Sequence, residues 1–109
     1  MTQMTISQAI NDYLQSVRLA RSPRTAATYK NALQYFTETI VDNQVDPATT
    51  LVTDLPENSI IWMTSALKNH AATTERLYLT AVTGFFNFLV AENLVDINLP
   101  RVRLLIQQR

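Results

Sequence analysis

Two stripes of polar side chains on predicted helices have the residue types and the spacing to contact nucleic acid. The first stripe comprises Arg24, Ala27, Lys30, Asn31 and Gln34, with Thr28 at its flank. The second comprises Arg76, Thr80, Thr83 and Asn87. Arg and Lys bind phosphate, and Arg, Asn and Gln also make paired hydrogen bonds to base edges. Neither stripe contains an acid, but ordinary solvated helix faces are polar too, and that alternative stays open.

No set of residues forms a catalytic or metal-binding pattern. Acid–base catalysis needs grouped titratable side chains. The only histidine, His70, falls in a predicted turn, where we interpret it as exposed. A single glycine excludes a glycine-rich phosphate loop, and the lack of cysteine excludes thiolate ligands. The acids Asp42, Asp46, Asp54 and Glu57 are interpreted as a solvated surface. We therefore predict no enzyme, cofactor or metal.

The composition is typical of one helical domain. A chain of 109 residues has the size of a single domain, and at 47% hydrophobic and 17% charged it can bury a core. One Gly and four Pro supply too few turns for an all-β fold. Met1 to Met4 lack the pattern of a signal peptide, and no apolar run is long enough to span a bilayer. We expect an all-α, cytoplasmic protein without a membrane partner.

The charges are unevenly distributed, although nine basic and nine acidic residues give zero net charge. Residues 1–37 carry four bases and one acid, and residues 38–57 carry five acids and no base. Residues 58–109 carry five bases and three acids. A molecule polarised in this way can approach phosphates with its basic side.

Four helices are predicted from apolar periods and capping residues. Their ranges are Ile6–Leu19, Pro23–Val41, Pro56–Lys68 and Thr74–Glu92. Thr5 and Gln8 have the spacing of a capping box. Ser22 followed by Pro23 is typical of a helix start, because proline tolerates the first helical position. Asp54, with Glu57 three residues on, is the predicted acidic cap of the third helix. Asn93 is the predicted C-cap of the fourth helix.

The connecting segments are less regular. An acidic loop is predicted from Asp42 to Thr53. Residues 94–109 are either a short helix or an extended linker, since Asn98-Leu99-Pro100 interrupts regular structure. The aromatic side chains are assigned to the core, except Tyr35, which falls on the polar side of the second helix and is expected to be partly exposed.

Two motifs resemble those of a known family. They are Ser22-x-x-Thr25-x-x-x-Tyr29-x-x-x-Leu33 and Leu79-Thr80-Ala81-Val82-x-x-Phe85-Phe86-x-Phe88-Leu89. In this order and spacing they resemble the N-terminal core-binding domain of the tyrosine recombinases, or phage integrase family. The resemblance covers nearly the whole chain and implies a four-helix, SAM-like domain over residues 1–97. Residues 98–109 would then be a tail leading toward a catalytic domain that this chain lacks.

The resemblance also implies a DNA-facing surface, because the second and fourth helices of the family face DNA. By position the DNA-facing residues are Arg24, Thr25, Thr28, Lys30 and Asn31, then Arg76, Thr80, Thr83 and Asn87, with Arg21 on backbone phosphate. Where many relatives carry Arg or Lys, this chain has Thr83 and Gly84, which removes expected phosphate contacts. The residues that cleave DNA in the family belong to the absent domain, so no recombinase activity is expected.

The implied partners are duplex DNA and other protomers of the recombinase on DNA, the isolated domain being a monomer or a weak oligomer. The alternative is a helical protein-interaction module without DNA binding, favoured by zero net charge and an apolar tail that could dock into a neighbour. That tail comprises Val102, Leu104, Leu105 and Ile106. The DNA hypothesis requires the cations to share one face, away from the acids. The cations are Arg21, Arg24, Lys30 and Arg76, and the acids are Asp42, Asp46 and Glu57.

Overall fold

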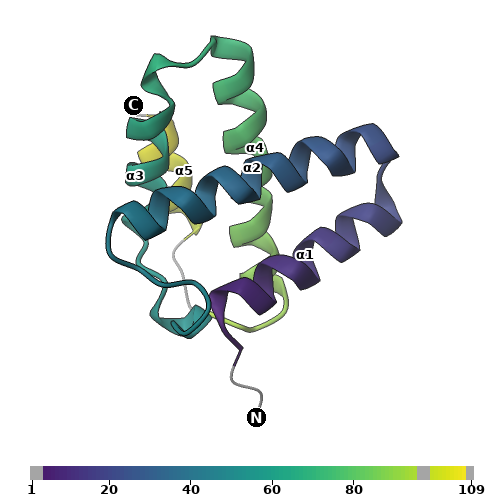
Figure 1. Ribbon diagram of the computed structural model, residues 1–109, viewed down its shortest axis with the longest axis vertical. Coiled ribbons are helices and arrows are strands. Elements are labelled where there is room, and N and C mark those ends of the chain that lie inside the picture. The colour runs from purple at the N-terminus through teal and green to yellow at the C-terminus, as the bar shows by residue number, and fades with distance from the viewer. Residues whose placement is uncertain (1–3, 96–98, 108–109) are drawn as a thin grey trace.

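The chain folds into helices joined by turns, as its apolar periods predict (Figure 1). The computed structural model describes residues 4–95 and 99–107. Within them lie α1 (Ile6–Ala20), α2 (Pro23–Asp42), α3 (Ser59–Ala66), α4 (Ala72–Ala91) and α5 (Leu99–Gln107), with the 3₁₀ helices η1 (Val52–Asp54) and η2 (Leu67–Asn69). These residues form no strand, so the all-α prediction is confirmed, with five α-helices in place of the four predicted.

Both predicted helix starts at the N-terminal end are confirmed by their capping hydrogen bonds. The backbone amide of Gln8 donates to the Thr5 hydroxyl over 3.2 Å, and the backbone amide of Thr5 donates to the side-chain oxygen of Gln8 over 2.9 Å. Ser22 caps α2 by accepting from the Thr25 amide over 3.2 Å, and Pro23 follows in the first turn. These caps satisfy amide groups that have no partner inside a helix.

The predicted start of the third helix was wrong. Pro56 and Glu57 lie in a turn, and α3 begins only at Ser59, whose hydroxyl donates to the Pro56 carbonyl over 2.7 Å. The predicted acidic cap, Asp54, belongs to η1 instead. At the end of α4, Asn93 adopts a φ of 56°, and the Leu94 amide returns to the Leu89 carbonyl over 2.9 Å. The C-cap itself is Glu92, one residue before the predicted Asn93, which follows it in the left-handed conformation that closes the helix.

The tail forms a helix that packs on its own domain. Helix α5 lies against α3 and α4, and its Val102 is fully buried. An exposed ion pair joins Arg101 to Glu57, with 3.1 Å between nitrogen and oxygen. The helical alternative is therefore confirmed for residues 99–107, whereas Asn98 lies outside the described residues. The apolar tail covers the chain's own core, which removes one argument for docking into a neighbour.

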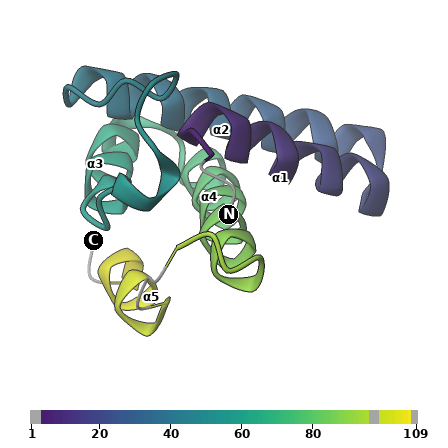
Figure 2. The same cartoon turned by 90° about the horizontal axis from the view of Figure 1, so that it is seen from below.

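The core lies where the α1–α2 hairpin crosses α4 (Figure 2). Phe36 of α2 meets Phe85 and Phe86 of α4 at ring-centroid distances of 6.2 Å, and all three are fully buried. Tyr13 of α1 packs against the same cluster, with its ring tilted by 50° to that of Phe85 and the two centroids 5.6 Å apart. The aromatic residues thus hold α4 beneath the hairpin, and the next section describes the surface that results. Among the described helices, none has the length and apolarity needed to cross a membrane.

Candidate functional site

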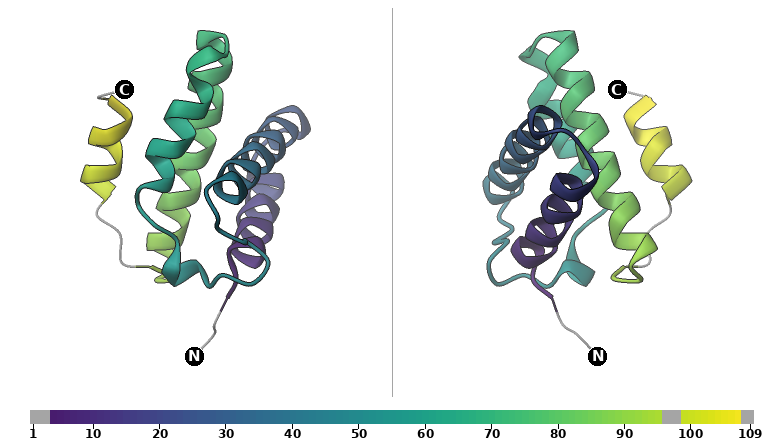
Figure 3. Two further views of the ribbon diagram at one scale, coloured as in Figure 1. Left: turned by 60° about the vertical axis from the view of Figure 1, so that its left-hand side comes forward. Right: turned by 90° about the vertical axis from the view of Figure 1, so that its right-hand side faces the viewer.

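A groove runs along the polar stripe of α4. Figure 3, right, shows α4 passing between the α1–α2 hairpin and α5. The groove has a volume of about 420 Å³ and is lined by Arg21, Tyr29, Arg76, Leu79, Thr80, Thr83, Gly84, Asn87 and Ile106. Half of the predicted DNA-facing residues therefore meet in one hollow, although they come from two distant parts of the chain.

The floor of the groove is the helix face opposite the phenylalanine core. Arg76, Thr80, Thr83 and Asn87 repeat at helical spacing along α4, so they point the same way. The Thr80 hydroxyl donates to the Arg76 carbonyl over 2.8 Å, so its proton already has an acceptor within the helix. Thr83 and Asn87 are half-buried, and no hydrogen bond from either side chain is found among the described residues. Their polar groups therefore remain available for a ligand.

One hydrogen bond between α1 and α4 holds the two helices close together beside the groove. The Tyr13 hydroxyl donates to the Ala81 carbonyl over 2.9 Å, and a Cβ atom at Gly84 would collide with the same hydroxyl. The chain's only glycine therefore permits a close approach. Burial raises the pKa of Tyr13, the nearby Tyr29 raises it further, and Arg21 opposes both. The Tyr13 phenol thus stays neutral and acts as a structural donor.

The walls of the groove come from the end of α1, from α2 and from α5, and Arg21 supplies their positive charge. Arg21 lies at the C-terminal end of α1, where its amide donates to the Val17 carbonyl over 2.8 Å and its cation complements the helix dipole. Tyr29 of α2 lies 6.4 Å from the Tyr13 ring, and Ile106 of α5 closes the far side. No carboxylate appears among the described residues that line the groove. Two arginines above hydroxyl and amide groups suit an anionic, hydrogen-bonding ligand.

The predicted residues of α2 divide into two groups. Arg24, Thr28 and Asn31 share one face of the helix, which continues to Tyr35, and none of the three lines the groove. The Thr28 hydroxyl donates to the Arg24 carbonyl over 3.1 Å, a local helical bond. Thr25 serves the Ser22 cap, since the Ser22 hydroxyl also donates to the Thr25 hydroxyl over 3.1 Å.

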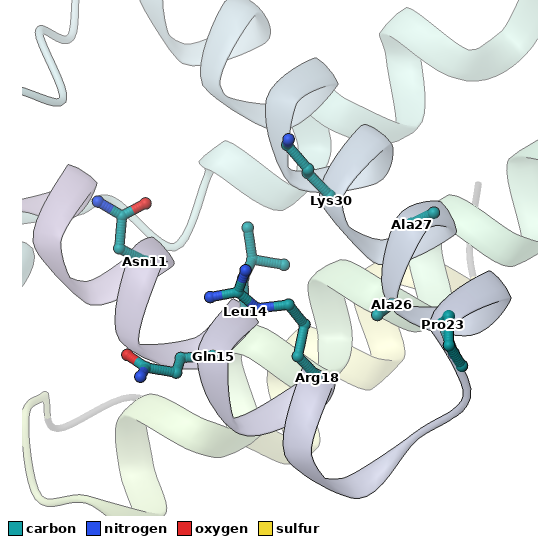
Figure 4. A pocket seen from close by; sticks show the side chains of 8 residues that line it. All are labelled: Asn11, Leu14, Gln15, Arg18, Pro23, Ala26, Ala27 and Lys30. Atoms are coloured by element: carbon teal, nitrogen blue, oxygen red, sulfur yellow. The ribbon is translucent and has the colours of Figure 1, made fainter.

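Lys30 belongs to a different hollow, between α1 and α2 (Figure 4). This outer hollow has a volume of about 560 Å³ and is lined by Asn11, Leu14, Gln15, Arg18, Pro23, Ala26, Ala27 and Lys30. Of the four cations expected on one face, Arg21 and Arg76 line the groove, Lys30 lines the outer hollow, and Arg24 lines neither. The acidic residues predicted to lie elsewhere line neither hollow among the described residues.

The lone histidine and Tyr35 pack together outside both hollows. His70 is exposed and lies edge-on to the Tyr35 ring, with centroids 5.3 Å apart. Tyr35 is half-buried, as expected, and its hydroxyl donates to the Ala66 carbonyl over 3.0 Å. The ring also contacts Tyr78 of α4 at 5.9 Å, so both residues act in packing. No group of three or more potential metal ligands occurs in the described part of the chain.

Sequence reasoning missed four residues of the groove, namely Tyr29, Leu79, Gly84 and Ile106. Tyr29 was assigned to the core, although it is half-buried and reaches the groove wall. Ile106 was assigned to a tail, and Gly84 was seen only as a lost cation. The single glycine inside a helix was the available signal, because such a glycine often marks a close approach. Comparisons with protein-family models, curated proteins and solved structures find no match for this chain.

Proposed function

We propose that this chain is the DNA-binding, core-binding domain of a tyrosine recombinase or integrase, with the family's SAM-like helical arrangement. The observation that carries the proposal is the groove along α4. Arg21 and Arg76 flank a floor of short polar side chains, and the described lining has no carboxylate to repel a phosphate backbone. The resemblance of the helix motifs to that family supplies the second support.

In this proposal the groove takes the sugar-phosphate backbone of duplex DNA. The two arginines neutralise phosphates, and Thr83 and Asn87 donate hydrogen bonds to phosphate or sugar oxygens. Arg24 and Asn31, on the neighbouring face of α2, extend the contact and supply modest base readout. The domain would position the parent enzyme on its site, while strand cleavage would belong to a separate catalytic domain.

The test is fluorescence anisotropy of a labelled random duplex titrated with the domain at several salt concentrations. Each phosphate contact contributes about −0.9 to the slope of log affinity against log salt. The double variant Arg21→Ala/Arg76→Ala should therefore reduce the magnitude of that slope by about 2 and weaken binding at low salt. Thr83→Val keeps the shape of the side chain but removes its hydroxyl, so affinity should fall while the slope stays constant.

The matched control is Lys68→Ala, which removes one exposed cation outside the groove. It should leave the salt slope close to that of the wild type. Wild-type binding that is insensitive to the two arginine substitutions would contradict the proposed groove. Absence of binding to the duplex at low salt would contradict DNA binding by the isolated domain.

A further inference from the structure

The outward side of α2 carries a stripe whose two halves have matching spacing but opposite charge. In order the stripe comprises Ala27, Lys30, Gln34, Glu38 and Val41, and all five are exposed. Their spacings of three, four, four and three residues keep them within one narrow face. The sequence of types is apolar, base, amide, acid and apolar, so Gln34 is the centre of a stripe with opposite charges at equal distances.

The two charges of the stripe, Lys30 and Glu38, have no oppositely charged partner within residues 4–95 and 99–107. Among the described residues, no salt bridge or hydrogen bond of the Lys30 or Glu38 side chain is found. Glu38 and Asp42 are both exposed, are one turn apart and lie at the C-terminal end of α2, where no base is present. Like charges at this spacing and acids at a helix C-terminus are both unfavourable. A cationic partner at this end of α2 would relieve both effects.

The surroundings of the stripe are open. Figure 2 shows α1 and α2 along one edge of the molecule, with the other helices on a single side of them. Next to Ala27 lies the outer hollow, whose floor includes the aliphatic side chains of Leu14 and Ala26. Val41, at the other end of the stripe, is 50% exposed, so a partner placed there would bury part of its apolar surface. The helix thus has an unfilled hollow at one end and an uncovered valine at the other.

We propose that two copies of this chain pair through antiparallel α2 helices that cross at Gln34. In this register Lys30 faces Glu38 of the second copy, and the two Gln34 amides meet on the two-fold axis. Val41 of the second copy then lies opposite Ala27 and enters the outer hollow. Every contact away from the axis occurs twice, as in an isologous dimer. The inference rests on the α2 stripe alone and goes beyond DNA binding.

Charge complementarity selects this arrangement over the alternatives. A parallel pair would place Lys30 against Lys30 and Glu38 against Glu38, which is repulsive. Zero net charge also favours association, because no overall repulsion separates two copies. The stripe from Ala27 to Val41 covers about 20 Å of helix at 1.5 Å per residue, long enough for an antiparallel contact. Surface ion pairs are weak individually, so the dimer should be weak and salt-sensitive.

The test is sedimentation velocity over a range of protein concentrations at low and high salt. Lys30→Glu and Glu38→Lys should each lower the association constant about tenfold or more, because each turns two attractive pairs into two repulsive ones. The double variant Lys30→Glu/Glu38→Lys should restore association, since the swapped charges again face their opposites. An equimolar mixture of the two single variants should form a heterodimer although neither associates alone.

A second measurement fixes the register. The chain has no cysteine, so Gln34→Cys should be cross-linked to dimer by a short bismaleimide, whereas Ser65→Cys, exposed on α3, should not. Wild-type protein that stays monomeric at low salt and high concentration would overturn the proposal. So would a charge-swapped double variant that fails to recover association, or equal cross-linking at Gln34 and Ser65.

Discussion

Replacement of the chain's only glycine, Gly84, tests how closely α1 packs against α4. Alanine is more favourable than glycine inside a helix by about 1 kcal/mol, so Gly84→Ala would stabilise an ordinary helix. Here the new methyl group collides with the Tyr13 hydroxyl and disturbs its 2.9 Å hydrogen bond to Ala81. Overpacking costs about 1–3 kcal/mol, and the lost hydrogen bond about 1 kcal/mol more. We expect a net loss of about 1–3 kcal/mol in the free energy of unfolding.

Removal of the Tyr13 hydroxyl should reverse the effect of the same substitution. Tyr13→Phe alone costs about 1 kcal/mol for the lost hydrogen bond. In that background the nearest atom to a Cβ at Gly84 is the ring Cζ atom of residue 13, at 3.4 Å. Alanine then fits and contributes its helix propensity, so Gly84→Ala should stabilise by up to about 1 kcal/mol.

The assay is a double-mutant cycle of the wild type, Gly84→Ala, Tyr13→Phe and the double variant. Unfolding in urea is monitored by far-ultraviolet circular dichroism and fitted with a common m-value. The coupling energy between the two sites should be about 2 kcal/mol or more. Additive substitutions would refute the reasoning. Stabilisation by Gly84→Ala in the wild-type background would refute it as well, because it would mean that the hydroxyl does not limit the approach of α4.

Two more predictions concern the packing around this core. Val102→Ala removes two buried methyl groups, so it should lower the free energy of unfolding, measured by urea denaturation, by about 2 kcal/mol. Leu104 is half exposed, so Leu104→Ala should change that free energy by less than about 0.5 kcal/mol. Equal losses would mean that α5 does not pack as described. Burial raises the pKa of Tyr13 above its ordinary value, so stability should be intact below about pH 10 and fall above it. Tyr13→Phe should make that alkaline fall shallower.

The helix starts of the hairpin could be predicted because their causes are local. Thr5 and Gln8 satisfy each other across one turn, and Ser22 precedes a proline that suits the first helical position. The apolar faces were equally predictable, since Phe36 and Phe85 recur with their neighbours at helical spacing. In each case a few adjacent residues decide the outcome, and no distant partner is needed.

The later features depend on partners far away in the sequence. The start of α3 is delayed to Ser59 by a turn at Pro56, whereas the sequence also offered an acidic cap at Asp54. The tail becomes a helix because Val102 finds a buried site between α3 and α4, a fact that no local pattern contains. Propensity alone is a weak guide where tertiary packing decides.

A helical wheel also cannot say which flank of a polar face a neighbouring helix will cover. Lys30 and Arg24 both lie on the polar side of α2, but α1 packs along one flank only. Lys30 therefore borders the outer hollow, while Arg24 lies on the other flank. The groove could be predicted only in part for the same reason. The wheel found the stripe of α4 and the family resemblance suggested Arg21, but only the tertiary fold adds Ile106.

The dimer stripe shares no residue with the groove along α4, although Arg24 and Asn31, which are proposed to extend the DNA contact, lie beside that stripe on α2. The stripe centred on Gln34 consists of exposed residues of α2, while the groove follows α4, which passes between the hairpin and α5 (Figure 3). Pairing through α2 would leave both grooves of the dimer open and related by a two-fold axis. Two-fold symmetry in a protein matches two-fold symmetry in a DNA site. If such a dimer binds DNA more tightly than a monomer, DNA must promote pairing by the same factor, because coupling between sites is reciprocal.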